Sequence, residues 1–194
     1  MSFETALAAL VLAAGEGSRM GRPKATILWR GRSFARHAVA LAEAAGCAPI
    51  VVVSGAVRLT AADLGSAEQV WNEGWSQGPT SSLRRGLEAL PRGRSVLLLT
   101  VDRPHLRPDT ALALAAAARE APTAIWQPVH EGRRGHPILY PADLVPILLA
   151  LPLATSPREL LARPEISARR RLLPTADPAV LDNIDHPEDL SRLL

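Results

Sequence analysis

The residues best suited to chemistry lie in the stretch LAAGEGSRMGRPKA (12–25), directly after an apolar run. It contains three glycines and three cations: Gly15, Gly17, Gly21, Arg19, Arg22 and Lys24. Lys24 is the only lysine among the chain's 22 lysines and arginines. Glycine lets the backbone approach a ligand closely, and a lysine ammonium is a compact charge on a flexible stem. The stretch therefore predicts a phosphate-binding loop, with a solvated glycine-rich turn as the alternative.

Two common phosphate-binding motifs do not fit this loop. The P-loop has a glycine directly before its lysine, and no glycine of this chain precedes a lysine. The dinucleotide fingerprint G-x-G-x-x-G differs in spacing, because the third glycine here comes one residue later. Pro23 also interrupts the helix that this fingerprint would start. A wider loop that holds a triphosphate remains.

A second chemical residue, Asp102, ends the most strongly predicted strand, SVLLLTVD (95–102). In a parallel α/β sheet, ligands bind at the carboxyl ends of the strands. A carboxylate there, opposite a phosphate loop, suits Mg²⁺, which takes one or two carboxylates together with substrate phosphates and water. We expect a metal ligand at this position, with a turn or helix-cap aspartate as the alternative.

Alternating strands and helices must position these two features. Apolar runs predict buried strands at 6–14, 48–55, 68–71, 95–102 and 124–128. Helices are predicted between them, at 34–45 with Ser33 as N-cap, after Thr60, up to Leu90 from a cap at Thr80 or Ser81, and at 108–121. The later chain predicts a strand at 136–140, a helix at 142–151, broken helix at 157–173, a strand at 178–185 and a closing helix at 186–194. This order predicts an α/β fold with a doubly wound, mostly parallel sheet in a single domain, 1–194.

Composition narrows the class of protein. The chain is 47% hydrophobic and 21% charged, and its net charge of +3 favours anionic partners but is too small to indicate nucleic acid. Its single cysteine excludes an internal disulfide and suits a reducing compartment. The N-terminus carries Glu4 and no basic residue before the apolar run, so no signal peptide is indicated, and that run is too short to span a membrane. We expect a cytoplasmic protein without a membrane or nucleic-acid partner.

The loop LAAGEGSRMGRPK resembles the signature of the MobA-like NTP transferase family, the nucleotidyltransferases that finish the molybdenum cofactor, with relatives that act on sugar phosphates. The resemblance implies a Rossmann-like, glycosyltransferase-A-like fold in which this loop holds a nucleoside triphosphate. The Leu-Ala-Ala-Gly form, through Ala14, is similar to the cytidylyltransferase branch and favours CTP over GTP. With matches in NEGWSQGPTSSLRRGLEAL (72–90), the implied nucleotide-binding residues are Leu12, Ala13, Ala14, Gly15, Gly17, Arg19, Gly21, Lys24, Asn72 and Ser82.

Two further motifs resemble the metal-binding part of that family. Asp102-Arg103-Pro104 matches its Asp-x-Pro, although Arg103 is more cationic than the family pattern suggests. LDNIDHPEDL (181–190) resembles its Asn/Asp-Ile-Asp-Thr-Pro-Glu-Asp motif and places Asn183 at the second metal contact. The resemblance thus implies Mg²⁺ bound by Asp102 and Asn183. We expect His186 to begin the last helix and Asp182 to point away from Asn183.

EGRRGHPILY (131–140) is similar to the cytidylyltransferase branch at Gly135, His136 and Pro137, which implies an acceptor pocket there. Arg133 and Arg134 suit an acceptor phosphate, with surface charge as the alternative. The segment TSPRELLARPEISARRR (155–171) lacks the branch's Gly-Asp-x-Gly-Ala-Arg, so the acceptor stays open, and Arg158 is one candidate for the missing arginine.

Together these resemblances imply an Mg²⁺-dependent nucleotidyltransferase. It would move a nucleoside monophosphate from an NTP, CTP in preference, to a phosphorylated acceptor, molybdopterin in preference, and release pyrophosphate. Lys24, Arg19 and Asp102 would be catalytic, with a nucleotide-binding part at about 1–105 and an acceptor-side part at about 106–194. Transfer to a sugar phosphate and a non-catalytic role in cofactor binding or insertion are the alternatives. A molybdoenzyme or its chaperone is a further partner that the resemblance allows.

Overall fold

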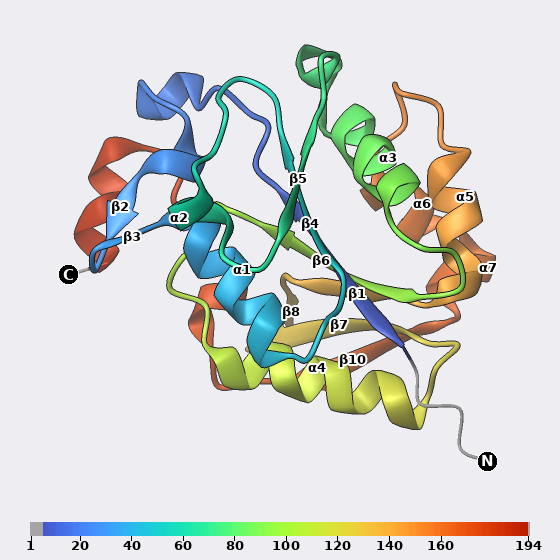
Figure 1. Cartoon of the computed structure of the whole chain (residues 1–194). Coiled ribbons are helices and arrows are strands. Elements are labelled where there is room, and N and C mark those ends of the chain that lie inside the picture. Colours follow the sequence, from blue (N-terminus) through green and yellow to red (C-terminus); the bar gives the residue numbers. More distant parts are fainter. Residues whose placement is uncertain (1–5, 194) are drawn as a thin grey trace.

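A mostly parallel sheet forms the centre of the computed structural model, which describes residues 6–193 (Figure 1). Its strands lie in the order β10-β7-β9-β6-β1-β4-β5, and β8 pairs with β7. The strands of this sheet are β1 (Leu7–Leu12), β4 (Ile50–Ser54), β5 (Glu68–Trp71), β6 (Ser95–Thr100), β7 (Ile125–His130), β8 (Arg133–Arg134), β9 (Ile138–Tyr140) and β10 (Arg170–Pro174). A separate antiparallel hairpin joins β2 (Leu28–Trp29) and β3 (Arg32–Ser33). The predicted doubly wound α/β fold is confirmed.

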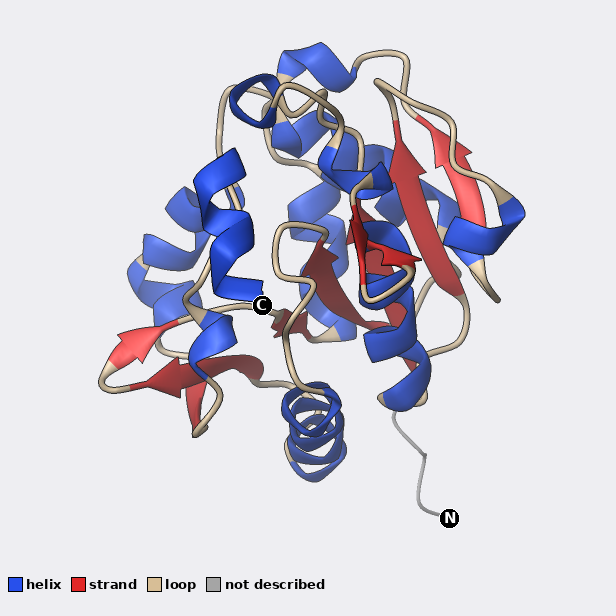
Figure 2. Ribbon diagram, turned by 90° about the vertical axis from the view of Figure 1, so that its left-hand side faces the viewer, coloured by secondary structure: helices blue, strands red, loops and turns tan. Residues whose placement is uncertain are grey.

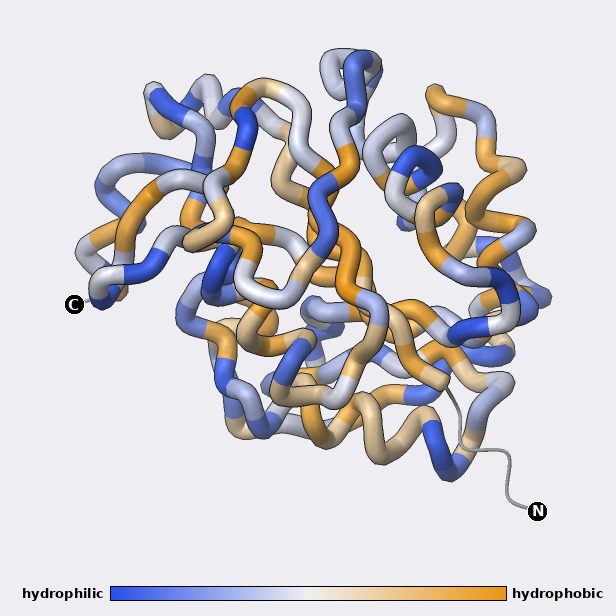
Figure 3. The backbone as a smooth tube through the Cα atoms, in the orientation of Figure 1, coloured by the Kyte–Doolittle hydropathy of each residue, from blue (hydrophilic) through white to orange (hydrophobic). Residues whose placement is uncertain are grey.

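Helices cover both faces of this sheet (Figure 2). The α-helices are α1 (Phe34–Ala44), α2 (Ala61–Leu64), α3 (Pro79–Ala89), α4 (Pro108–Glu120), α5 (Val145–Leu149), α6 (Pro157–Ala162) and α7 (Pro164–Ser167). Alternate residues of β1 enter two different apolar clusters: Ala9 and Val11 pack with α1 and α4, whereas Ala8 and Leu10 pack with α3 and α5. This period of two is that of a strand buried on both faces, and the central strands are accordingly the most hydrophobic part of the chain (Figure 3).

The register of the sheet decides where the functional loops meet. Leu12, at the end of β1, pairs with Val53 of β4 on one side and with Thr100 of β6 on the other, in parallel orientation. The carboxyl ends of these three strands therefore share one edge. The loop after β1 and the Asp102 turn after β6 consequently lie side by side.

Local capping signals explain why several helices begin where they were predicted. The Ser33 hydroxyl accepts a hydrogen bond from the Arg36 N–H at 3.2 Å and starts α1. Thr60 and Asp63 form a reciprocal capping box at α2. The predicted cap of α3 is wrong, because the helix begins at Pro79 with Gly78 as its N-cap. The Ser81 hydroxyl instead contacts the Gly78 carbonyl at 2.8 Å.

The second half of the chain departs most from its predicted elements. The 157–173 region is helical only through α6 and α7, after which β10 pairs in parallel with β7. Predicted strand 178–185 is wrong: it begins as the 3-10 helix η5 (Pro178–Val180) and continues as a loop. Pro178 favours a helical first turn, and the Asp177 carboxylate accepts from the Ala179 N–H at 3.1 Å to cap it.

The remaining 3-10 helices are η1 (Ser18–Met20), η2 (Lys24–Thr26), η3 (Trp75–Gln77), η4 (Ala142–Leu144) and η6 (Pro187–Leu193). The predicted helix 142–151 is thus η4 followed by α5, and the closing helix is the 3-10 helix η6, with Leu194 outside the described residues. Glu4, used for the signal-peptide prediction, also lies outside them. Within residues 6–193, every helix is too short or too polar to cross a membrane.

Candidate nucleotide site

The loop after β1 folds back on itself through two glycines in the left-handed region. Gly17 (φ 67°) and Gly21 (φ 71°) flank the short helix η1. A Cβ on Gly17 would lie 2.1 Å from the carbonyl oxygen of Arg22, so only glycine fits there. This close approach brings the two ends of the loop together and sets the position of Lys24 at the start of η2.

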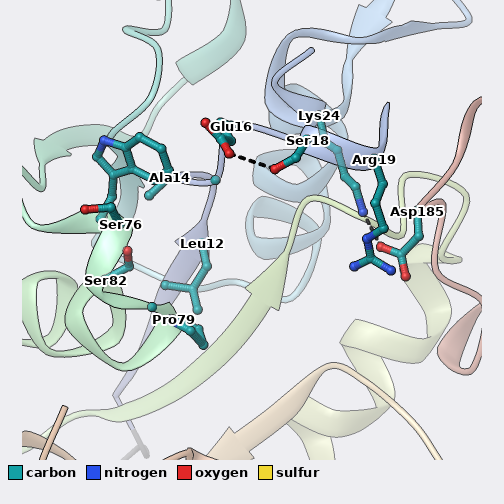
Figure 4. A pocket seen from close by; sticks show the side chains of 14 residues that line it. Leu12, Ala14, Glu16, Ser18, Arg19, Lys24, Ser76, Pro79, Ser82 and Asp185 are labelled. Atoms are coloured by element: carbon teal, nitrogen blue, oxygen red, sulfur yellow. Dashed lines mark hydrogen bonds and ion pairs between the residues drawn. The ribbon is translucent and has the colours of Figure 1, made fainter. Parts of the chain in front are cut away.

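A pocket of about 390 Å³ lies against this loop (Figure 4). The glycine loop forms one wall, and the N-terminus of α3 with the segment before it forms the other. Seven of the predicted nucleotide-binding residues line it: Leu12, Ala14, Gly15, Gly17, Arg19, Lys24 and Ser82. Backbone N–H groups at a helix N-terminus, facing a glycine loop that carries two cations, form a suitable environment for phosphates.

Three predicted nucleotide-binding residues lie outside the pocket lining. Ala13 is buried in the core, and Gly21 is the exposed end of the η1 turn. Asn72 is buried, and its amide donates to the hydroxyls of Ser81 and Ser82 at 3.0 Å each. Asn72 therefore holds the N-terminal part of α3 in place from behind the pocket wall.

Lys24 forms an ion pair across the site with Asp185, a residue that the sequence did not single out as a ligand. The Nζ atom donates to Asp185 Oδ1, and Arg19 lies on the same side of the pocket (Figure 4). Partial burial alone would raise the pKa of Asp185, but the hydrogen bond and charge of Lys24, helped by the Arg19 charge, hold that pKa below its usual value. The sequence feature that could have identified Asp185 is its position in the Asn-Ile-Asp motif, two residues after Asn183.

The two predicted metal ligands converge on one guanidinium. Arg103 Nη1 donates to Asp102 Oδ1 at 2.9 Å, and Nη2 donates to Asn183 Oδ1. The Asp102 carbonyl also accepts from the Ile184 N–H at 2.8 Å, which fixes the 181–186 loop beside the end of β6. The structure thus brings Asp102 and Asn183 together, although 181–186 is a loop and not a strand.

The Asp102 carboxylate and the Asn183 amide oxygen suit a divalent cation whose remaining ligands come from outside the chain. Within residues 6–193, no cluster of three or more His, Cys, Asp or Glu side chains forms a self-sufficient metal site. One carboxylate and one amide oxygen that face the same point, next to a phosphate pocket, match the way Mg²⁺ binds through few protein ligands plus substrate phosphates. A cation can bind here only if the Arg103 guanidinium breaks its hydrogen bonds to Asp102 Oδ1 and Asn183 Oδ1.

A second, larger pocket of about 850 Å³ adjoins the first, and both are lined by Leu12 and Pro79. Its polar walls contain one histidine, one glutamine and three arginines: His136, Gln127, Arg134, Arg158 and Arg170. Among residues 6–193, no acidic side chain lines it. The pocket is therefore strongly cationic and lies directly beside the site of the loop cations.

His136, one of the predicted acceptor residues, is neutral in this pocket. Burial, reinforced by the positive charge of Arg103 and opposed by Asp102, lowers the pKa of His136 to about 4. Its Nδ1 atom is buried and has no hydrogen-bond partner in the described chain. Gly135 shapes the wall rather than lining it, because a Cβ there would lie 2.4 Å from the Val180 carbonyl oxygen. Pro137 follows His136 through a cis peptide bond and also lies outside the lining.

Two further polar residues line this pocket that the sequence motifs did not predict. Gln127 comes from β7, and its Oε1 atom is buried without a partner, while its Nε2 donates to the Gly135 carbonyl at 2.9 Å. Arg170 comes from β10 and its Nε atom is likewise buried and unpartnered. Burial, with help from the Arg134 charge, lowers the pKa of Arg170 from its usual value. Arg133 is exposed on β8 and does not line the pocket.

Comparison with known proteins decides the family. Residues 9–170 match the family described as the MobA-like NTP transferase domain. The chain belongs to this family. The resemblance of the glycine loop and of the later motifs to this family is thereby confirmed.

The similar proteins differ in what their names say they do. A nicotine blue oxidoreductase from Paenarthrobacter nicotinovorans is 28% identical over 95% of this chain and 95% of its own. A probable molybdenum cofactor guanylyltransferase from Opitutus terrae is 33% identical over 62% of this chain and 60% of its own. The crystal structure of Rv0371c from Mycobacterium tuberculosis shares the fold, with a TM-score of 0.77, 22% identity and 98% of both chains covered. A manganese complex of Rv0371c also shares it, with a TM-score of 0.72, 21% identity and 98% of both chains covered.

In this MobA-like chain, two residues of the 181–190 motif have structural roles. The His186 N–H donates to Asp189 Oδ2 at 2.8 Å, as expected for the start of the last helical segment. Asp182 pairs with His105 at 3.1 Å and with Arg192 at 2.5 Å. The expected orientation of Asp182, away from Asn183, assumed alternating side chains along the predicted strand 178–185, which is not formed.

Proposed function

We propose that this chain is a nucleotidyltransferase that moves a nucleoside monophosphate from CTP to a phosphorylated acceptor, molybdopterin, and releases pyrophosphate. The observation that carries this proposal is the pair of adjoining cationic pockets that share Leu12 and Pro79. One is built from a glycine loop and a helix N-terminus, and the other from three arginines. Two anions bound in them would meet at the end of β1, where the reacting phosphorus must lie.

The first pocket suits the triphosphate. Lys24 and Arg19 face it from the glycine loop, and the charge on Asp185 neutralises Lys24 before a nucleotide binds. When the nucleotide arrives, the flexible Lys24 stem can turn its ammonium from Asp185 to the α-phosphoryl oxygens, where charge builds up during transfer. The preference for CTP is supported by the Leu-Ala-Ala-Gly form of the loop.

The second pocket suits a phosphorylated acceptor. Arg134, Arg158 and Arg170 supply cationic donors, whereas Gln127 Oε1 and the Nδ1 atom of neutral His136 are buried polar atoms without partners. Buried polar groups are normally hydrogen-bonded, so the unpaired Gln127 acceptor and the unpaired His136 ring nitrogen favour a ligand that carries hydrogen-bonding groups of its own. An anion with N–H groups on a ring, such as a phosphorylated pterin, has both features. The named activity of the Opitutus relative supports molybdopterin in particular.

The chemistry needs little from the protein besides charge and position. A phosphate monoester is already ionised near neutral pH, so its oxygen can attack the α-phosphorus without a general base. Asp102 and Asn183 would hold a divalent cation, Mg²⁺ or Mn²⁺, which offsets the repulsion between the two anions. Lys24 and Arg19 stabilise the charge on the α-phosphoryl group and on the departing pyrophosphate.

Pyrophosphate release tests the proposal against its alternatives. Purified protein is incubated with Mg²⁺, each of the four NTPs in turn, and either molybdopterin or glucose 1-phosphate. Release with CTP and molybdopterin alone supports the proposal, and release with the sugar phosphate identifies a different acceptor class. Because one relative is named an oxidoreductase, a parallel incubation follows NADPH oxidation with nicotine blue. Oxidation of NADPH without any pyrophosphate release would contradict the proposal.

A further inference from the structure

Arg103 occupies the point on which both predicted metal ligands converge. Its Nη1 atom lies 2.9 Å from Asp102 Oδ1 and 2.9 Å from Thr100 Oγ1, and Nη2 contacts Asn183 Oδ1. Only 10% of the Arg103 side chain is exposed. One buried guanidinium thus bridges an aspartate just after β6 and an asparagine in a loop 80 residues after Arg103 itself.

A divalent cation and this guanidinium cannot share the two oxygens. Mg²⁺ binds oxygen at about 2.0–2.1 Å in a near-octahedral arrangement, far closer than an N–H donor approaches. A guanidinium at hydrogen-bond distance from both ligands fills the space that the metal and its other ligands need. Its positive charge also repels the incoming cation, and it does so strongly because the group is largely buried.

The surroundings of Arg103 leave part of its hydrogen-bonding capacity unused. Its Nε atom is buried and has no hydrogen-bond partner in the described chain, so the side chain leaves one donor unsatisfied where it lies. Thr100 and His136, which flank it, also line the second pocket. His136 is neutral and therefore adds no repulsion to a guanidinium that turns toward that pocket. A guanidinium that turned this way would move toward the pocket in which an anionic acceptor would bind.

We infer that Arg103 is a positioning residue that takes the place of the divalent cation in the metal-free protein. It holds Asp102 and Asn183 close together, and it must release both before the metal binds. The metal therefore binds weakly by itself and needs the nucleotide phosphates to outcompete Arg103. This inference rests on the proposed metal ligands but not on the identity of either substrate.

Binding of Mn²⁺ alone, measured by the loss of its free electron paramagnetic resonance signal, tests this without any turnover. Arg103→Met keeps the length and apolar stem of the side chain but removes the competing charge. We expect it to bind Mn²⁺ roughly tenfold more tightly than the unchanged protein, as removal of one close like charge predicts. Arg85→Met is the matched control, because Arg85 is exposed and its ion pair is with Glu88 of the same helix. It should leave Mn²⁺ affinity unchanged.

A purely structural role for Arg103 predicts the opposite result. If Arg103 only clamps the two segments, its removal separates Asp102 from Asn183, and Mn²⁺ affinity stays equal or falls, which would overturn the inference. Arg103→Lys guards against misfolding of the methionine variant. It keeps the charge but replaces the two nitrogens that contact Asp102 and Asn183 by one nitrogen on a shorter side chain, so it should bind Mn²⁺ with intermediate affinity. Adding Asn183→Ala to Arg103→Met should abolish the increase in Mn²⁺ affinity. Tight binding that survives this second change would place the metal elsewhere and also overturn the inference.

Discussion

The Lys24 ammonium donates to the Asp185 carboxylate and so joins the loop after the first strand to a segment 161 residues further along the chain. Both side chains are mostly shielded, with 17% and 26% of their surfaces exposed. The pair neutralises the lysine charge of this pocket while leaving it on the same side as Arg19 (Figure 4). A single lysine in an arginine-rich chain is thus held by a carboxylate, which under the proposed function it exchanges for a phosphate.

Lys24→Ala should lower kcat/KM for nucleotidyl transfer by about 10²–10³, the typical effect of removing one donor to a developing negative charge. Lys24→Arg should also be harmful, because the planar guanidinium differs in size and geometry from an ammonium. Steady-state pyrophosphate release measures both. Arg22→Ala is the control, since Arg22 is an exposed cation of the same loop whose side chain lies outside the pocket lining. Unchanged turnover in Lys24→Ala would contradict the proposed role of Lys24 at the α-phosphoryl group.

Gly17→Ala should destabilise the protein by roughly 1–3 kcal/mol, because it forces a side chain into the left-handed region and onto the Arg22 carbonyl. Gly15→Ala is matched to it, since a Cβ at Gly15 has no atom within 4 Å and the residue does not have a positive φ. Urea unfolding of the two variants measures the difference. Equal stabilities would show that the close approach at Gly17 is not needed.

His136 should stay neutral down to mildly acidic pH, because its pKa is lowered to about 4 by burial and by the nearby Arg103 charge. The unfolded chain takes up this proton at about pH 6.5, so the stability contributed by neutral His136 is complete above that pH and is lost as pH falls toward 4. NMR titration of the ring measures the pKa directly. His136→Gln should have a smaller loss of stability between pH 6.5 and 4, and a His136 midpoint near 6.5 would contradict the burial.

Arg170→Met should raise KM for the acceptor and leave KM for the nucleotide nearly unchanged, because Arg170 lines the second pocket and not the first. A charged hydrogen bond of this kind contributes about 1.5–3 kcal/mol, which corresponds to a rise in KM of roughly 10–100-fold. Arg171→Met is the neighbouring control, since Arg171 is exposed and outside both pocket linings. Equal effects of the two variants would mean that only net charge matters.

The sequence predicted those features that depend on local patterns. The strand 95–102, the helix capped by Ser33 and the glycine loop all follow from neighbouring residues, and the structure forms each of them. Strand 178–185 failed because Asp177 and Pro178 start a helical turn that apolar periodicity does not reveal. Helical periodicity also hid β10, whose pairing with β7 is a tertiary contact between distant segments.

The predicted site residues likewise separate into those identified by local motifs and those set by contacts between distant segments. Motifs named Lys24, Asp102 and Asn183, but could not reveal that Arg103 binds both metal ligands or that Asp185 pairs with Lys24. Arg170 stands among three consecutive arginines, where strand alternation turns one inward and its neighbour outward. Only the folded sheet distinguishes them.

The fate of the α-phosphorus tests the central claim most directly. CTP labelled with ³²P at the α-position is incubated with the protein, Mg²⁺ and molybdopterin, and the products are separated by charge and size. The proposed function predicts that the label moves to the acceptor as a cytidine dinucleotide, in amounts equal to the pyrophosphate released, and that Lys24→Ala slows both by the same large factor. Label that stays in CTP, or leaves it only as free CMP, would contradict nucleotidyl transfer between the two pockets.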